Sequence, residues 1–112
     1  MKQITAFIHK HRISAVIHAL RDIESTFTSE RQQVRNINVV VVQGLLKAVD
    51  SQEQRYALDL AEPVIDECKL ELLCDDDQAD GIASVIGAAA RTGQSEAGWI
   101  CIMDVAQVVK ID

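Results

Sequence analysis

The sequence has little of the material that several protein classes require. One of its 112 residues is proline and three are cysteine, and no two cysteines form a C-x-x-C pair. No apolar run approaches the roughly 20 residues of a membrane-spanning helix. The opening Met-Lys-Gln-Ile-Thr alternates in polarity instead of forming the apolar core of a secretory leader. We therefore expect a cytoplasmic protein that neither spans a membrane nor depends on disulfides.

Positive charge is also scarce. The chain has 11 Lys and Arg against 17 Asp and Glu, a formal net charge of −6 at pH 7, which opposes binding along nucleic-acid phosphates. Nucleic acid is therefore not an expected partner. Enzyme motifs are missing too, because the chain has no nucleophile elbow, Walker loop or H-E-x-x-H motif. We accordingly expect no catalytic residues and no enzyme activity.

The chain does contain enough apolar material for one core, since 48% of its residues are hydrophobic, and residues 1–112 are interpreted as a single domain. Residues from Gln3 to Ile8 alternate in polarity, which predicts a strand. An apolar pattern of helical spacing follows and predicts a helix. Its members are Ile13, Val16, Ile17, Leu20 and Ile23. The segment from Thr26 to Gln33 begins with β-branched and aromatic residues and is predicted as a second strand.

The second half of the chain repeats this pattern. A strand is predicted from Lys69 to Cys74, and Asp77 is expected to cap a helix that follows it. This helix is predicted to run to Arg91. Gly93 then lies where a residue in the left-handed backbone conformation commonly ends a helix. The apolar residues from Trp99 to Met103 predict the last strand. The resulting order is that of an α+β, ferredoxin-like βαββαβ sandwich.

Two features of this plan point to partners. Two helices cover only one face of such a sheet, so Phe7 and Leu73 on the other face predict packing against another subunit in a closed homo-oligomer. A long excursion separates the two halves, roughly from Val34 to Glu62. It contains a strand-like run from Ile37 to Val42. The capping-box spacing from Ser51 to Gln54 predicts a short helix that ends before the single proline. Excursions of this length are commonly functional, so we expect it to bind a partner.

The cysteine, aspartate and histidine residues could bind a metal, but each group is first interpreted as structural. The three cysteines, Cys68, Cys74 and Cys101, are interpreted as reduced core thiols. The acidic run from Asp75 to Asp77 suits a helix N-terminus and needs no metal. The histidines, His9, His11 and His18, are interpreted as solvated surface residues, and no metal site is assigned. In the alternative, His9 and His11 share one face of a strand and hold zinc or copper together with a carboxylate.

Three stretches together resemble the PII signal-transduction proteins. They are Lys69-Leu-Glu-Leu-Leu-Cys-Asp-Asp-Asp77, Ala89-Ala-Arg-Thr-Gly93 and Trp99 to Val109, and the strand and helix from Ile4 to Leu20 match more loosely in the same frame. The resemblance implies a homotrimer with adenine nucleotides in the clefts between subunits. It also implies a T-loop, here about residues 34–62, that projects toward a target protein such as a transporter or a metabolic enzyme.

The resemblance further implies which residues bind the nucleotide. The segment from Thr92 to Gly98 corresponds to the B-loop, whose backbone N–H groups approach phosphate. Thr26 corresponds to a threonine that contacts the base, Leu73 to an apolar residue beside it, and Lys110 to a basic position near the phosphates. The nucleotide-binding set is therefore Thr26, Leu73, Arg91, Thr92, Gly93, Glu96, Ala97, Gly98, Trp99 and Lys110.

The chain departs from the family at the phosphate-binding positions. Glu96-Ala-Gly-Trp99 stands where the family has Gly-Asp-Gly-Lys, and Asp112 stands at a second basic position. Each lost charge-assisted hydrogen bond weakens binding by about 1.5–3 kcal/mol. We therefore expect ADP or AMP rather than ATP as the effector, with a second small ligand such as bicarbonate and no required cofactor. The alternative is a metal-responsive or non-nucleotide-binding trimer similar to the divalent-cation-tolerance proteins.

Overall fold

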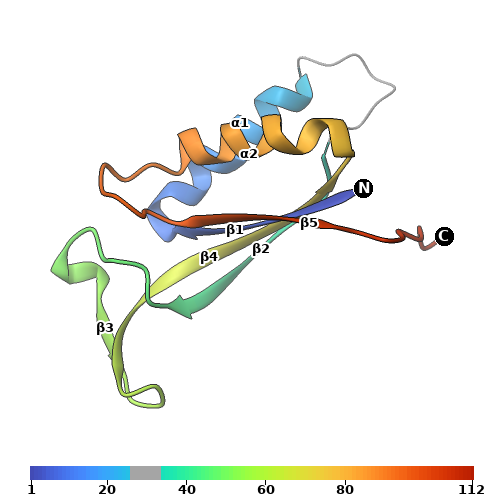
Figure 1. Ribbon diagram of the computed structural model, residues 1–112. Coiled ribbons are helices and arrows are strands. Elements are labelled where there is room, and N and C mark those ends of the chain that lie inside the picture. Colours follow the sequence, from blue (N-terminus) through green and yellow to red (C-terminus); the bar gives the residue numbers. More distant parts are fainter. Residues whose placement is uncertain (26–33) are drawn as a thin grey trace.

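The computed structural model describes residues 1–25 and 34–112, and in this part of the chain two helices lie on one face of an antiparallel sheet (Figure 1). Strand β1 (Lys2–His9) leads through a 3-10 turn into α1 (Ile13–Ser25). Then come β2 (Val34–Gly44), a second 3-10 turn (Ser51–Glu53), β3 (Arg55–Ala57) and β4 (Glu62–Cys74). A third 3-10 turn precedes α2 (Ala79–Ala89), and β5 (Trp99–Asp104) is the last strand.

The strand order of the main sheet is β2-β4-β1-β5, and every neighbouring pair is antiparallel. The short β3 pairs with the outer end of β4, away from the helices (Figure 1). With one helix between β1 and β2 and one between β4 and β5, the chain has the predicted α+β, ferredoxin-like plan. None of the helices in the described residues is long and apolar enough to cross a membrane.

The core lies between the helices and the two central strands. Alternation along β1 places Ile4, Ala6 and Ile8 toward the helices, and all three are buried. Their partners across β4 are Leu72, Leu70 and Cys68, which are buried as well. Val16 and Leu20 of α1 and Ile82 and Ile86 of α2 complete this layer. The periodicity of the sequence therefore predicted the helix-covered face correctly.

Helix and turn boundaries differ from the prediction in three places. The N-cap position of α2 is Gln78 and not the predicted Asp77, and the Gln78 side chain makes no cap hydrogen bond. The helix ends at Ala89, and Gly93, whose φ is +90°, lies beyond its C-terminal cap. The predicted helix after Ser51 is a single 3-10 turn. Its N-cap is Asp50, whose carboxylate accepts hydrogen bonds from the backbone N–H groups of the second and third residues that follow it.

The excursion is more ordered than a loop. Val34 to Gly44, including the predicted run from Ile37 to Val42, form β2 as an edge strand of the main sheet, and Glu62 begins β4. The part outside the main sheet is therefore residues 45–61, and Figure 1 shows it beyond the edge of the helix layer. The strand predicted from Thr26 to Gln33 lies outside the described residues.

Two of the three cysteines are core thiols, as predicted. Cys68 and Cys74 are buried, and burial raises the pKa of both thiols. Cys101 contradicts the prediction: it is exposed, on the sheet face opposite the helices, where Thr5 is its partner on β1. Hence one thiol is accessible in the isolated chain.

Candidate functional site

The connection between α2 and β5 carries most of the predicted nucleotide-binding residues. It begins after Ala90, the C-cap of α2, and passes through two left-handed backbone positions, Gly93 with φ +90° and Glu96 with φ +52°. A non-glycine residue rarely adopts such a φ, so Glu96 is held there by its surroundings. Left-handed positions turn successive N–H groups toward one side, which is how backbone loops bind anions.

Gly98 has a packing reason to be glycine. A Cβ built at this position would overlap the carbonyl oxygen of Phe7, in the central strand β1. Because the obstructing atom belongs to the backbone, it cannot rotate away as a flexible side chain would. Only glycine therefore allows the loop to lie this close to β1 before it enters β5.

A cavity of about 210 Å³ lies where this connection meets β1 and α2. Five of the predicted residues line it, namely Arg91, Glu96, Ala97, Gly98 and Trp99. Among its described lining residues Arg91 is the one cation and Glu96 the one anion. Ligand pockets usually measure about 300–1,000 Å³, so a single chain forms a recess smaller than a complete nucleotide site.

The structure does not bring the other predicted residues to this cavity. Leu73 pairs with Gln3 on β1, whereas Trp99 pairs with Phe7. These two β1 positions are four residues apart in sequence, which separates them by roughly 13 Å along the strand. Lys110 follows the opposite end of β5, is exposed and pairs with Asp112 at 3.5 Å. Thr92 and Gly93 belong to the connection but do not line the cavity. Thr26 lies outside the described residues.

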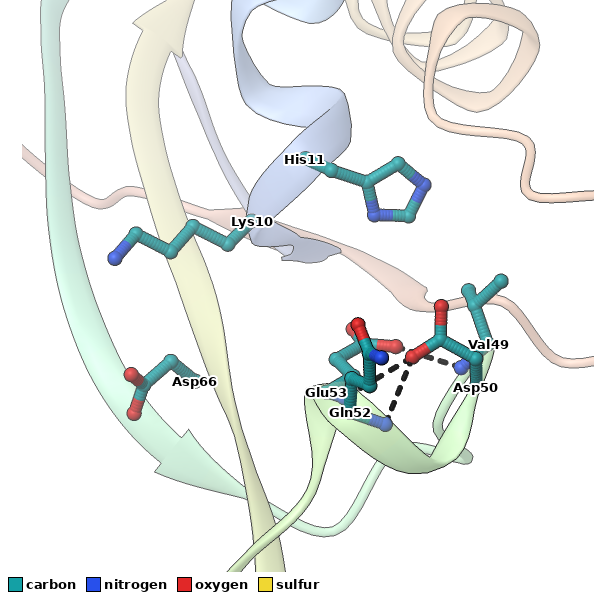
Figure 2. A pocket seen from close by; sticks show the side chains of 7 residues that line it. All are labelled: Lys10, His11, Val49, Asp50, Gln52, Glu53 and Asp66. Carbon is teal, nitrogen blue, oxygen red and sulfur yellow. Dashed lines mark hydrogen bonds between the residues drawn. The ribbon is translucent and has the colours of Figure 1, made fainter.

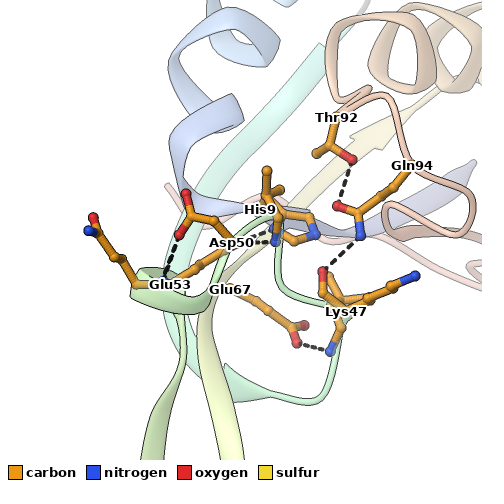
Figure 3. A network of polar contacts seen from close by, with 10 residues as sticks. His9, Lys47, Asp50, Glu53, Glu67, Thr92 and Gln94 are labelled. Carbon is orange, nitrogen blue, oxygen red and sulfur yellow. Dashed lines mark hydrogen bonds and ion pairs between the residues drawn. The ribbon is translucent and has the colours of Figure 1, made fainter.

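The excursion contacts this connection directly, through a residue that the sequence reasoning missed. The Gln94 side chain accepts a hydrogen bond from the Thr92 hydroxyl at 2.9 Å and donates one to the backbone carbonyl of Lys47 at 3.2 Å (Figure 3). No periodicity or motif marks Gln94, because its partner is 47 residues away in the sequence. The predicted B-loop and the first part of the excursion are therefore joined.

Two buried polar residues of the sheet anchor the same part of the excursion (Figure 3). Glu67 of β4 is buried and accepts a hydrogen bond from the backbone N–H of Leu46 at 3.0 Å. The absence of a side chain at Gly44 leaves room for the Glu67 carboxylate. His9, at the end of β1, lies opposite Glu67 across the strands and contacts Glu53 at 2.5 Å. The excursion is thus attached to β1, to β4 and to the connection before β5.

His9 corrects the interpretation of the histidines as solvated surface residues. Its side chain is 0% exposed, because the turn that carries Glu53 covers it. His11 is exposed, but it belongs to the 3-10 turn after β1 and not to the strand, so the two rings do not share a strand face. They still lie close, with ring centroids 5.8 Å apart.

Comparison with known proteins gives relatives of one kind. No family model matches the chain. The chain is similar to three proteins named nitrogen regulatory protein P-II, from Porphyra purpurea (28% identical), Nostoc punctiforme (27%) and Pyropia yezoensis (24%). Each match covers 100 residues, 89% of this chain and 89% of the relative.

Proposed function

We propose, from the premise that this chain is a divergent PII-like protein, that it is a cytoplasmic regulator in which a small effector changes the affinity of the excursion for a target protein. The relatives carry the name of regulatory proteins, not of enzymes. The observation that carries the proposal is the hydrogen bond from Gln94 to Lys47. Through it, a ligand that reorganises the connection before β5 acts on the excursion by direct contact.

The effector is an adenine nucleotide with few phosphates, such as ADP or AMP. Arg91 supplies the cationic group of the cavity, while Glu96 and Trp99 occupy positions where the family has glycine and lysine. A triphosphate would meet too few cations there, because Trp99 stands where the family has its lysine. Bicarbonate is the proposed second ligand, and a transporter or a metabolic enzyme the proposed target.

A homotrimer completes the site in this proposal. The sheet face away from the helices carries exposed apolar side chains, and Trp99 and Met103 are 57% and 46% exposed. Burying such a face against identical subunits stabilises an assembly by removing apolar area from water. The same assembly brings residues of a neighbouring chain beside the small cavity. Leu73 and Lys110, which lie away from that cavity in one chain, are then available to the site of the next.

Calorimetric titration tests the proposal. ATP, ADP, AMP and cyclic AMP are titrated separately into the purified protein, with and without bicarbonate. We expect ADP or AMP to bind more tightly than ATP. Arg91→Gln should weaken that binding about tenfold, the equivalent of one charge-assisted hydrogen bond. The matched control is Arg55→Gln, because Arg55 pairs with Asp66 on the strands outside this cavity. Absence of measurable binding of all four nucleotides would contradict the proposed effector.

A further inference from the structure

A second cavity, of about 530 Å³, lies between the end of β1 and the excursion, away from the proposed nucleotide site. Figure 2 shows His11 and Lys10 on one side of it and the turn with Asp50 and Glu53 on the other. The lining has three carboxylates, Asp50, Glu53 and Asp66, against the one ammonium group of Lys10. Arg55 pairs with Asp66 at 2.9 Å, so an excess of one carboxylate remains. Its electrostatic character therefore favours a cation.

Three groups suited to a transition metal converge beside this cavity, of which His11 and Glu53 line it and His9 is buried behind them. His9, His11 and Glu53 each offer one ligand atom, and these atoms lie within 4.8 Å of one another. Atoms so placed all fit within about 2.8 Å of a common point, and zinc binds nitrogen and carboxylate oxygen at about 2.0–2.2 Å. A shift of roughly 0.6–0.8 Å per side chain brings the atoms to zinc-binding distance. Two imidazoles and one carboxylate, with an open position for water, are a donor set that zinc uses in proteins.

His9 already contacts a second ligand group of the cluster. A carboxylate only accepts hydrogen bonds, so the 2.5 Å contact between His9 Nδ1 and Glu53 Oε1 places the imidazole proton on Nδ1 when no ion is bound. An ion bound beside Glu53 takes the lone pair of Nδ1, and the ring then carries its proton on Nε2, which is the other neutral tautomer. Two of the three ligand groups are therefore neighbours before the ion binds.

We propose that His9, His11 and Glu53 form a binding site for a divalent transition-metal ion, with zinc as the fitting representative. Glu53 is already oriented, because its second oxygen accepts a hydrogen bond from the backbone N–H of Val49 at 2.6 Å. The ion joins the end of β1 to a turn of the excursion 44 residues further along the chain. Metal binding thereby fixes the excursion to the sheet, whether or not a nucleotide is bound.

The distinguishing variant is His11→Ala. His11 is exposed and makes no contribution to the hydrogen bond between His9 and Glu53, so this variant keeps the fold and the metal-free attachment of the excursion. His18→Ala is the matched control, because His18 is an exposed histidine on α1 and is not part of the cluster. Glu53→Gln, which keeps the shape of the side chain and removes its charge, is the second test variant.

The experiment is calorimetric titration of the chelator-treated full chain with zinc alone in a non-coordinating buffer. We expect one zinc per chain, at least tenfold weaker binding in His11→Ala and Glu53→Gln, and unchanged binding in His18→Ala. Cobalt should give the visible absorption of a tetrahedral site in the wild type and lose it in His11→Ala. Absence of zinc binding, equal binding in His11→Ala, or thiolate-to-cobalt absorption, which would place the ion at a cysteine, would overturn the proposal.

Discussion

Replacing Gly98 by alanine tests whether the connection before β5 depends on close backbone packing. A Cβ at this position overlaps the carbonyl oxygen of Phe7. Because that atom belongs to the central strand β1, the connection itself must move away. Forcing an extra methyl group into a packed site costs about 1–3 kcal/mol. Gly81→Ala is the matched control, because a Cβ at this position of α2 meets no atom within 4 Å.

The two variants should change stability in opposite directions. Alanine is favoured over glycine inside a helix by about 1 kcal/mol, so Gly81→Ala should raise the free energy of unfolding by about that amount. Gly98→Ala should lower it, which separates the variants by about 2–4 kcal/mol. Urea unfolding without nucleotide measures both, at one fixed protein concentration because assembly makes stability concentration-dependent. A Gly98→Ala protein as stable as the wild type would refute the packing argument and leave phosphate binding as the reason for this glycine.

Two further predictions concern residues outside the cavity. Arg12 donates hydrogen bonds from Nε and Nη2 to the carbonyl oxygen of Ala89, at 3.1 and 2.8 Å. It thereby supplies hydrogen-bond donors to a backbone carbonyl at the C-terminus of α2. Arg12→Met should lower the free energy of unfolding by about 1–3 kcal/mol in urea titrations, and Arg12→Lys by less; an unchanged Arg12→Met midpoint would show that water replaces the side chain. Cys68 and Cys74 should react slowly with a thiol reagent at neutral pH, since burial raises the pKa of both thiols and little thiolate forms. Cys101 should react quickly in a monomer and slowly in the proposed trimer, and rapid labelling of Cys101 in a protein that sediments as a trimer would contradict packing through this face.

The sequence allowed the helix-covered half of the fold to be predicted. Apolar periodicity located β1 and α1, because one face of each of these elements packs on the core, and a continuous apolar run located β5. The start of β4 at Glu62 was not predicted, because apolar periodicity depends on a face that packs against the helices. Its first residues extend past the helices and pair with the short β3, so no helix-side pattern marks them.

The candidate site was less predictable than the fold. Gly98 was found through the family resemblance, although its requirement for glycine comes from Phe7, more than 90 positions earlier in the sequence. His9 was misassigned because its burial depends on a turn that carries Glu53, 44 residues away. Gln94 falls within the predicted B-loop but was assigned no role, since a single amide between Gly93 and Ser95 has no distinctive local pattern. Contacts between distant segments position this site, and such contacts leave no periodic trace in the sequence.

Hydrogen–deuterium exchange with and without ADP measures the coupling between effector and excursion most directly. If ADP binds beside Arg91 and acts through the hydrogen bond from Gln94 to Lys47, it should slow exchange in residues 91–98 and also in residues 45–61. Gln94→Ala should retain the first effect and lose the second. Slower exchange confined to residues 91–98 in the wild type, or no change in either segment, would contradict a regulator that signals through its excursion.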